Sequence, residues 1–331
     1  MRCKALRNLG YELIEVDGSY VPAGIVGLAM RVLRRLNYSL DTTRGNERLL
    51  ASIGHFKPSL VWIDKGLCIT PRTLQTVRAI LPNVQIVHYS PDDMGQRHNQ
   101  SRQYLTSIPH YDLHVTTKSF NVDELYGLRA RAVLLVNNAY SDETHRPIEI
   151  SSKDSLILGG SVGFIGAFER ERADSLLFLA KHGVKVRVWG AGWGSWKKRN
   201  LHPNLVIEDR CLWGEEYARA ICSFDINLGF LRKLNRDLQT TRSIEIPACG
   251  RFMLAERTSE HLGLFTEGVE AEFFSSKEEL LKKCFYYLSH SEERERIAES
   301  GRQRCLRSGY SYERHVEAVL DRLRRLRSRA D

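Results

Sequence analysis

Short apolar runs alternate with helical patterns along this chain, which is typical of parallel α/β architecture. In the first half, five runs predict strands: ELIEVD (12–17), SLVWIDKG (59–66), QIVHYSP (85–91), LHVTT (113–117) and AVLLVNN (132–138). Helical patterns lie between them, for example over residues 25–36 and 71–81. Residues 141–154 are polar and unpatterned, and this stretch predicts an interdomain linker.

A second α/β series follows the linker. Its predicted strands are SLILGG (155–160), VKVRVWG (184–190), LVIEDR (205–210), DINLGF (225–230), RFMLAE (251–256) and AEFFSS (271–276). Two such domains facing each other would form a cleft at the carboxyl ends of their strands. We therefore expect an α/β protein with two Rossmann-like parallel-sheet domains, over residues 1–145 and 146–311.

The two ends of the chain are unusual. Residues 3–17 read as helix, turn and strand, whereas doubly wound domains usually begin with a strand. Either the sequence is truncated or mis-started, or the sheet does without its first strand. At the other end, residues 312–331 predict an amphipathic helix with a basic outer face. Its apolar stripe consists of Val316, Val319, Leu320, Leu323 and Leu326.

Composition narrows the class of protein. With 331 residues and 42% hydrophobic residues, the chain is long enough for two globular domains. Its seven cysteines are scattered without a CxxC pair, which favours reduced thiols in the cytoplasm over a disulfide framework or a zinc site. No apolar run approaches the ~20 residues that cross a bilayer. We therefore expect a soluble, cytoplasmic protein.

The net charge of +9 suits an anionic ligand, a nucleic acid or an acidic membrane surface. Five arginines lie among the last ten residues. The basic C-terminal helix is therefore expected to pack one stripe against the protein with a solvated basic face. The alternative is a weak association of this helix with an acidic membrane surface.

The segment TTRSIEIPACG (240–250) carries the strongest chemical signal. Thr240 or Thr241 can cap a helix there, and Arg242 with the first-turn amides would suit a diphosphate. Glu245, one turn deeper, could accept two hydrogen bonds from a ribose diol. The other interpretation is a surface helix with a solvated glutamate.

Two glycine-containing segments follow predicted strands. In SVGFIGAFERER (161–172), Gly163 and Gly166 would let the backbone approach a phosphate. An ordinary glycine turn is the alternative. In VWGAGWGSWKK (188–198), the G-x-G-x-G pattern differs from the dinucleotide fingerprint, so we expect a tight loop rather than NAD binding.

Several motifs of this chain, in the order in which they occur, resemble those of one enzyme family. RSIEIPACG (242–250), EHLGLFTEGVE (260–270), SKEEL with YYL (276–288) and GYSYERH (309–315) are similar to the C-terminal half of CgeB-like (spore-maturation type) glycosyltransferases, which have the GT-B fold. Fainter likeness extends upstream through GFIGAFERER and YSPDD. Many retaining members carry a glutamate eight residues before the ribose-binding one, whereas this chain has Asp237.

The resemblance implies a set of roles. It favours phosphate contact at the Gly163–Gly166 loop and makes Arg170 and Arg172 secondary candidates for that contact. Glu245 matches the glutamate that binds the donor ribose, and the loop at Cys211–Trp213, with Tyr217 beyond, would hold the nucleotide base. The alternative is that Trp213 packs under this loop. The final helix would cross back to the N-terminal domain. In HYSPDDMG (88–95), the candidates for the acceptor-side base are His88, Asp92 and Asp93, with Asp93 favoured. An Asp-capped turn is the other interpretation of that segment.

We therefore expect a glycosyltransferase that moves a sugar from a nucleoside-diphosphate sugar to a glycan, protein or small-molecule acceptor. Adjacent aspartates diverge and are not the D-x-D pair of metal-dependent enzymes, so metal independence and no further cofactor are expected. One alternative is a catalytically inactive sugar-nucleotide-binding module. The other is a basic nucleic-acid-binding protein, which would bind with steep salt dependence.

Overall fold

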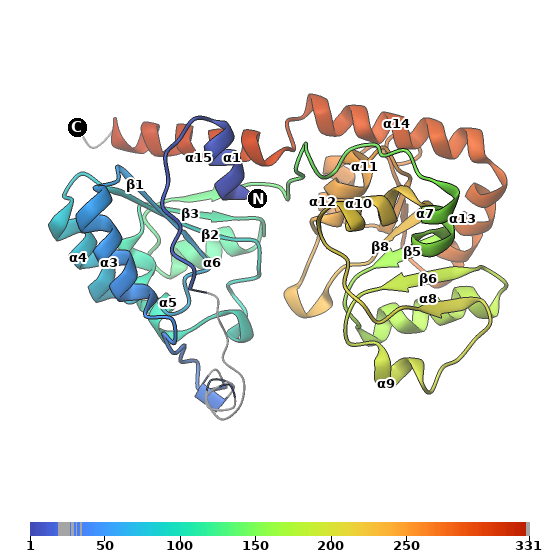
Figure 1. Cartoon of the computed structure of the whole chain (residues 1–331), viewed down its shortest axis with the longest axis horizontal. Helices are drawn as coiled ribbons and strands as arrows, with labels where there is room; N and C mark the ends of the chain where they lie inside the picture. Colours follow the sequence, from blue (N-terminus) through green and yellow to red (C-terminus); the bar gives the residue numbers. More distant parts are fainter. Residues whose placement is uncertain (19–26, 28–29, 31, 34, 329–331) are drawn as a thin grey trace. The chain divides into compact units, whose positions relative to one another are not determined.

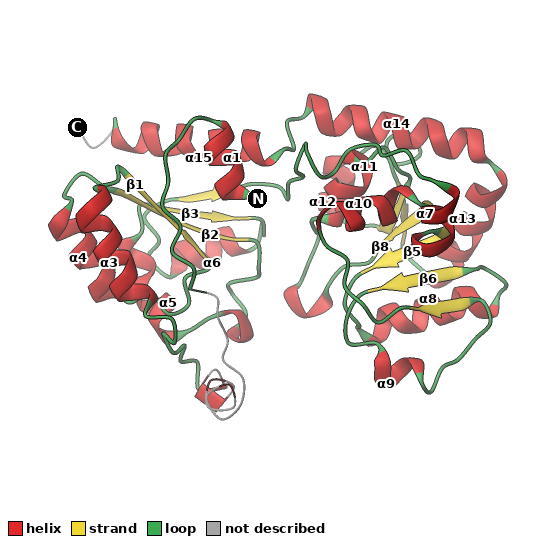
Figure 2. Cartoon of the chain, in the orientation of Figure 1, coloured by secondary structure: helices red, strands yellow, loops and turns green. Residues whose placement is uncertain are grey.

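Two compact units make up the chain. The computed structural model describes residues 1–18, 27, 30, 32–33 and 35–328. Met1–Asn137 with Glu313–Asp331 forms the first unit, and Asn138–Tyr312 forms the second. Each unit contains one parallel β-sheet with helices packed on it (Figures 1 and 2). The predicted α/β class with two parallel sheets is confirmed.

The first unit is built on a four-stranded parallel sheet in the order β1-β2-β3-β4. Its described helices and strands are α1 (Arg2–Asn8), α3 (Gly45–Phe56), β1 (Leu60–Asp64), α4 (Pro71–Ile80), β2 (Gln85–Ser90), α5 (Arg102–Ser107), β3 (Leu113–Thr116), α6 (Asn121–Gly127), β4 (Val133–Leu135) and α15 (Tyr312–Arg327). All four strands were predicted from apolar runs.

The strand predicted over residues 12–17 is wrong. These residues form neither helix nor strand, and Ile14 is 52% exposed. An alternation of apolar and polar residues forms a strand only where it pairs with a neighbouring strand, and among the described residues β1 pairs with β2 alone. The helix predicted just before it is confirmed as α1. Half of the residues of the helix predicted over 25–36 lie outside the described residues.

Period-two alternation assigns the strand side chains of the first unit to two faces. Ile86 joins Val61 and Ile63 in a cluster under α3 and α4. Val87, the next residue of β2, faces the opposite side, where it packs with Val319 and Leu323 of α15. The backbone carbonyl of Leu323 also accepts a 2.8 Å hydrogen bond from the Gln85 side chain. Helix α15 is therefore part of the core of the first unit.

A cluster of buried histidine and tyrosine rings lies on the α5 side of the first sheet. The His88 ring centroid lies 4.8 Å from that of Tyr104 and 5.1 Å from that of His114. Tyr111 lies 5.0 Å from His114. Burial lowers the pKa of His114 to about 4, and burial together with His114 holds the pKa of His88 well below its usual range. Both imidazoles are therefore neutral at pH 7.

These histidines should make the first unit sensitive to mild acid. Between pH 6.5 and 4 the unfolded chain binds protons that the folded chain refuses, so stability falls as pH falls. For His114 alone, lowering the pH from 7 to 5 should cost about 2 kcal/mol. The direct measurement is NMR titration of the His114 imidazole, with exposed His55 as the internal control. A His114 midpoint near 6.5 in the folded protein would show that burial does not shift this group.

The second unit contains a six-stranded parallel sheet in the order β10-β9-β8-β5-β6-β7. Its helices and strands are α7 (Ser152–Leu158), β5 (Gly160–Ile165), α8 (Arg170–Lys181), β6 (Val186–Trp189), α9 (Gly194–Lys197), β7 (Leu205–Ile207), α10 (Gly214–Cys222), β8 (Phe224–Gly229), α11 (Arg242–Ala248), β9 (Met253–Glu256), α12 (Ser259–Leu264), β10 (Glu272–Phe274), α13 (Lys277–Ser289) and α14 (Ser291–Arg307). The order reverses at β5, because β6 lies on one side of it and β8 on the other.

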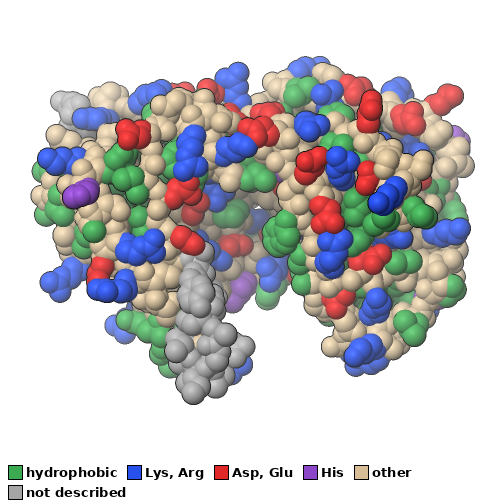
Figure 3. Space-filling model, viewed as in Figure 1, with side chains coloured by type: hydrophobic (Ala, Val, Ile, Leu, Met, Phe, Trp, Pro, Cys, Tyr) green, Lys and Arg blue, Asp and Glu red, His purple; other side chains and the backbone are tan. Residues whose placement is uncertain are grey.

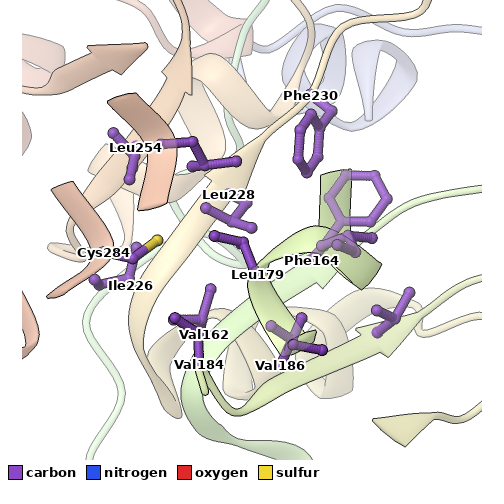
Figure 4. Close-up of a cluster of buried hydrophobic side chains, with 14 of the residues drawn as sticks. Val162, Phe164, Leu179, Val184, Val186, Ile226, Leu228, Phe230, Leu254 and Cys284 are labelled. Carbon is purple, nitrogen blue, oxygen red and sulfur yellow. The ribbon is translucent and has the colours of Figure 1, made fainter. Parts of the chain in front are cut away.

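Two cores cover the two faces of this sheet. One is drawn in Figure 4: Val162, Ile226 and Leu228 of the central strands pack against Leu179 of α8 and Cys284 of α13. The other packs α10 and α11 against alternate residues of the outer strands, Met253, Ala255 and Phe273 among them. The helices on both faces fix the strands whose carboxyl ends carry the polar residues described below.

The first strand of the second unit begins later than predicted. The apolar run at 155–160 forms α7, in which Leu156 is 77% exposed, and the strand begins at Gly160. A cap explains the helix, since the Ser151 hydroxyl accepts a hydrogen bond from the Asp154 amide. Gly159 ends it, and a Cβ there would meet the carbonyl oxygen of Ser223 at 2.1 Å.

Charge is spread over the surface rather than gathered. On the face drawn in Figure 3, Lys and Arg side chains are interspersed with Asp and Glu over both units. On α15, Arg314 pairs with Glu317 and Arg324 with Asp321. Part of the basic face of this helix is therefore neutralised by its own acidic residues.

Candidate functional site

The carboxyl edge of the second sheet, between β5 and β8, gathers most of the predicted donor-side residues. The strand order reverses there, and ligands of open parallel sheets bind outside the carboxyl ends of strands at such a reversal. Residues 166–172 leave β5 at this edge and residues 230–242 leave β8. These two connections and the first turn of α11 therefore converge beside the two strands.

Two arginines lie against one aromatic ring at this edge. The guanidinium carbons of Arg172 and Arg242 are 5.7 and 5.8 Å from the centroid of the Phe164 ring, which is itself buried between neighbouring aromatics. Burial first, and then the charge of Arg242, lower the pKa of Arg172 to about 10. Arg172 still carries its charge at pH 7, although its environment opposes that charge.

Each of these guanidiniums has a buried nitrogen without a hydrogen-bond partner. They are Nη2 of Arg172 and Nε of Arg242. The other Arg172 nitrogens donate to the carbonyls of Leu231 (3.3 Å) and Ala167 (3.2 Å). A buried donor without an acceptor costs about 1–3 kcal/mol, more when it is charged. An anion between the two arginines would satisfy both nitrogens and offset their mutual repulsion.

Acidic side chains nearby are largely paired with other cations. Glu169 bonds Arg232 at 3.2 Å and lies 3.7 Å from Arg172. Glu256 pairs with Lys233 and accepts the Leu231 amide at 2.9 Å. These carboxylates fix the connections after β5 and β8. Nη2 of Arg172 and Nε of Arg242 remain without a hydrogen-bond partner beside them.

Glu245 lies one turn along α11 from Arg242, so the two side chains share a face of the helix. It is 8% exposed, and its Oε2 accepts a 2.6 Å hydrogen bond from the Tyr217 hydroxyl of α10. His145 Nε2 lies 3.7 Å from Oε1. The interpretation of Glu245 as a solvated surface residue is wrong, because the carboxylate is held between two aromatic side chains.

The protonation of the Glu245 neighbours follows from their contacts. His145 Nδ1 accepts the Ser141 amide at 3.0 Å, so a neutral ring carries its proton on Nε2, toward Glu245. Burial lowers the pKa of His145 despite the opposing charge of Glu245. Burial, with Glu245 adding to it, holds the pKa of Tyr217 well above its usual range. Both groups are therefore neutral donors toward an acidic acceptor.

The start of α11 is fixed by side chains behind it. The Ser243 hydroxyl accepts the Thr240 amide at 3.0 Å and lies 2.7 Å from His261 Nε2. His261 Nδ1 in turn lies 2.6 Å from the Glu256 carbonyl. The predicted capping by a threonine side chain is wrong. Thr241 is the N-cap residue, but it has helical backbone angles and no side-chain cap, and the Thr240 amide is already bonded.

Gly163, Gly166 and Gly190 lie where neighbouring segments of the chain pack closely. Gly163 lies inside β5, where a Cβ would meet the Phe224 ring at 2.3 Å, so its predicted place in a phosphate-binding loop is wrong. The Gly166 amide donates to the Trp189 carbonyl at 2.8 Å. A Cβ on Gly190, whose φ is +140°, would meet the Gly166 carbonyl oxygen at 2.0 Å. The two glycine segments therefore allow close packing of neighbouring connections.

The predicted base-binding residues are divided. Tyr217 joins Glu245 as described, whereas Trp213, at the N-cap of α10, is 79% exposed, and Cys211 is partly buried on the same connection. The alternative that Trp213 packs under its loop is wrong. An exposed indole four residues before Tyr217 offers a flat apolar surface.

The three acceptor-side candidates differ in accessibility. Asp93 is fully buried, and its Oδ1 accepts the Gly95 amide at 3.0 Å and the Asn121 side chain at 2.9 Å. It therefore forms the Asp-capped turn that was the competing interpretation. His88 is buried in the ring cluster, with Nε2 3.2 Å from the Lys65 carbonyl. Asp92 remains accessible and pairs with Lys65 at 2.5 Å.

Some residues of this edge were missed or underrated by the sequence analysis. His145 lies within the stretch interpreted as a linker. Ser243 and His261 lie within the motifs that carry the family resemblance, but no role was predicted for them. Arg172 was placed behind Arg242, although it is the more buried. The sequence feature that could have identified Arg172 is its position near the start of a helix that follows a strand. Arg170, two residues earlier, instead pairs with Asp174 at the surface.

Two features are absent from the described residues. No group of three or more His, Cys, Asp or Glu in the described part of the chain is arranged to hold a metal ion. None of the described helices is long and apolar enough to span a membrane.

Comparisons with known proteins agree with this architecture. Residues 170–321 match a family model described as glycosyl transferase-like. Among solved structures, sucrose-phosphate synthase from Thermosynechococcus elongatus is similar at 14% identity and a TM-score of 0.60, covering 88% of this chain and 79% of that one. Anabaena HepE in complex with UDP-glucose is similar at 11% identity and a TM-score of 0.61, covering 84% and 82%.

A glycosyltransferase from Rickettsia africae is also similar, at 11% identity and a TM-score of 0.61, over 98% of this chain and 87% of that one. No curated protein gives a significant match. The two parallel sheets thus match those of GT-B glycosyltransferase structures, and the chain carries a glycosyl transferase-like domain that contains Arg172, Arg242 and Glu245.

Proposed function

We propose that this protein is a glycosyltransferase of CgeB-like type whose second unit binds a nucleoside-diphosphate sugar. One observation carries the proposal: Arg172, which is buried, and Arg242, which is partly buried, each have a buried nitrogen without a hydrogen-bond partner, beside a carboxylate at the strand reversal of a parallel sheet. Arg172 and Arg242 would hold the diphosphate, and Glu245 would accept the ribose hydroxyls. The family match over residues 170–321 and the UDP-glucose bound to HepE support this assignment.

The chemistry follows from these groups. In the transfer, the bond between the anomeric carbon and the diphosphate oxygen breaks, and the acceptor oxygen bonds to that carbon. Two guanidiniums fixed before the reaction would stabilise the negative charge that develops on the departing diphosphate. The acceptor proton must pass to a base, and among the three predicted residues we retain Asp92, because Asp93 and His88 are buried.

A thermal-shift screen tests donor binding. UDP, GDP, dTDP, CDP and ADP are each added to the protein, and a ligand that binds only the native state raises the Tm. We expect one of the five to raise it clearly more than the others, and UDP is tested first because of the HepE complex. Equal, negligible shifts with all five at millimolar concentration would remove the proposed donor class.

Metal independence is a separate prediction. The proposed site supplies its positive charge from Arg172 and Arg242, so glycosyl transfer or donor hydrolysis should continue in excess EDTA. The measurement is release of the nucleoside diphosphate with and without chelator. Complete loss that manganese or magnesium restores would overturn the prediction and return Asp92 to consideration as a ligand.

A further inference from the structure

Two buried cysteines meet where α10 and α11 end. Cys222 is the last residue of α10, and Cys249 directly follows α11. Their exposed fractions are 3% and 0%. The Cys222 sulfur lies 3.9 Å from the Cys249 carbonyl oxygen, and both side chains belong to the same buried cluster. Two cysteines 27 positions apart in the sequence are therefore neighbours within one core.

The environment of this pair differs from that of the other buried cysteines. The hydrogen bond from Cys249, together with the nearby Arg251, lowers the pKa of Cys222, while the same contact raises that of Cys249. Burial alone raises the pKa of Cys284 to about 12, and burial also raises that of Cys305. Cys222 is therefore the thiol of this core best able to react as a thiolate.

We propose that Cys222 and Cys249 form a reversible disulfide, in response to a peroxide, that fastens α10 to α11. The Cys222 thiolate attacks one peroxide oxygen, forms a sulfenic acid and releases hydroxide. Cys249 then loses its proton and attacks the sulfenic sulfur, and the oxygen leaves as a second hydroxide that is protonated to water. In total, two thiols are oxidised by two electrons and one hydrogen peroxide is reduced to two waters.

The bond would act on the two helices that carry the Tyr217–Glu245 hydrogen bond. Tyr217 lies five residues before Cys222, and Glu245 lies four residues before Cys249, about one helical turn away in each case. A disulfide draws its sulfurs to about 2.05 Å, closer than two thiols in contact. The bond therefore holds Tyr217 on the Glu245 carboxylate, where a ribose would have to compete with it. This consequence rests on the proposed function.

The first test does not depend on that function. The protein is treated with hydrogen peroxide, digested without reductant and mapped by mass spectrometry. We expect a 222–249 linked peptide pair that dithiothreitol separates, and a Tm several degrees above that of the reduced protein. Cys222→Ala and Cys249→Ala should each abolish the linked pair and the Tm rise, whereas Cys284→Ala, at a solitary buried cysteine of the other core, should retain both. Free thiols, or a sulfinic acid at Cys222, after treatment that oxidises exposed thiols would overturn the proposal.

The second test addresses the link to the donor site. The oxidised protein should bind the nucleoside diphosphate selected by thermal shift at least several-fold more weakly than the reduced protein, and dithiothreitol should restore the affinity. Equal affinities with the disulfide formed would overturn the link and leave the disulfide standing. Absence of nucleotide binding in the reduced protein would instead count against the proposed function.

Discussion

Removal of residues 312–331 should unfold or aggregate the first unit. Helix α15 places four almost fully buried side chains, Val316, Val319, Leu320 and Leu323, in that unit. Each contributes roughly 1.5–3 kcal/mol by transfer scales, as an upper bound. Their sum is comparable with the whole stability of a typical domain, about 5–15 kcal/mol. The loss should be seen as a large decrease in Tm, or as aggregation, of the shortened chain.

A point substitution separates packing from the basic face of the helix. Val319 is 1% exposed and packs with the sheet, whereas its neighbour Ala318 is exposed. Val319→Asp buries a carboxylate without a partner and should lower the Tm strongly, while Ala318→Asp should leave it nearly unchanged. If both variants melt like the parent, α15 does not brace the unit. A helix that serves only to bind acidic lipid would leave a stable core when removed.

Replacing Glu245 by alanine should weaken nucleotide binding by about 1.5–3 kcal/mol, the range for hydrogen bonds to a charged group. This corresponds to a roughly 10- to 150-fold higher Kd. The carboxylate is held by Tyr217 on one side and faces His145 on the other, so its position is fixed before a ribose arrives. Calorimetric titration of the folded variant with the selected nucleotide measures the effect.

Two control variants make the Glu245 result specific. Tyr217→Phe removes one hydrogen bond to the carboxylate but keeps the acceptor, so its effect should be smaller than that of Glu245→Ala. Glu171→Ala removes an exposed carboxylate of α8 and should bind like the parent. Unchanged affinity in Glu245→Ala, with a normal melting transition, would exclude Glu245 from the site.

Short apolar runs in the sequence predicted most of the strands. Strands of a parallel sheet are buried on both faces, so they appear in the sequence as such runs. The two errors have different causes. The run at 12–17 has the composition of a strand, but strand pairing depends on neighbours that the run itself does not contain. The run at 155–160 is apolar enough for a strand, but the Ser151 cap and Gly159 make it a helix.

The candidate site was predicted less completely than the fold, and the reason is three-dimensional. The sequence around Gly163 predicts a turn, and nothing in it indicates that this glycine faces the Phe224 ring. Adjacent aspartates look alike in sequence, yet Asp93 is buried under Asn121 and Asp92 reaches Lys65. The meeting of Arg172 with Arg242 depends on the β5–β8 pairing, which joins segments about 60 residues apart along the chain. Only tertiary contacts decide these roles.

The central claim is that the arginine pair of the second unit holds a diphosphate, and it is tested most directly by calorimetric titration. The wild-type protein is titrated with the nucleoside diphosphate selected by thermal shift, with the matching monophosphate and with the nucleoside. The account predicts the tightest binding for the diphosphate and the weakest for the nucleoside, because each phosphate gives Arg172 and Arg242 a charged acceptor. Equal affinity for all three, or binding of none, would contradict it.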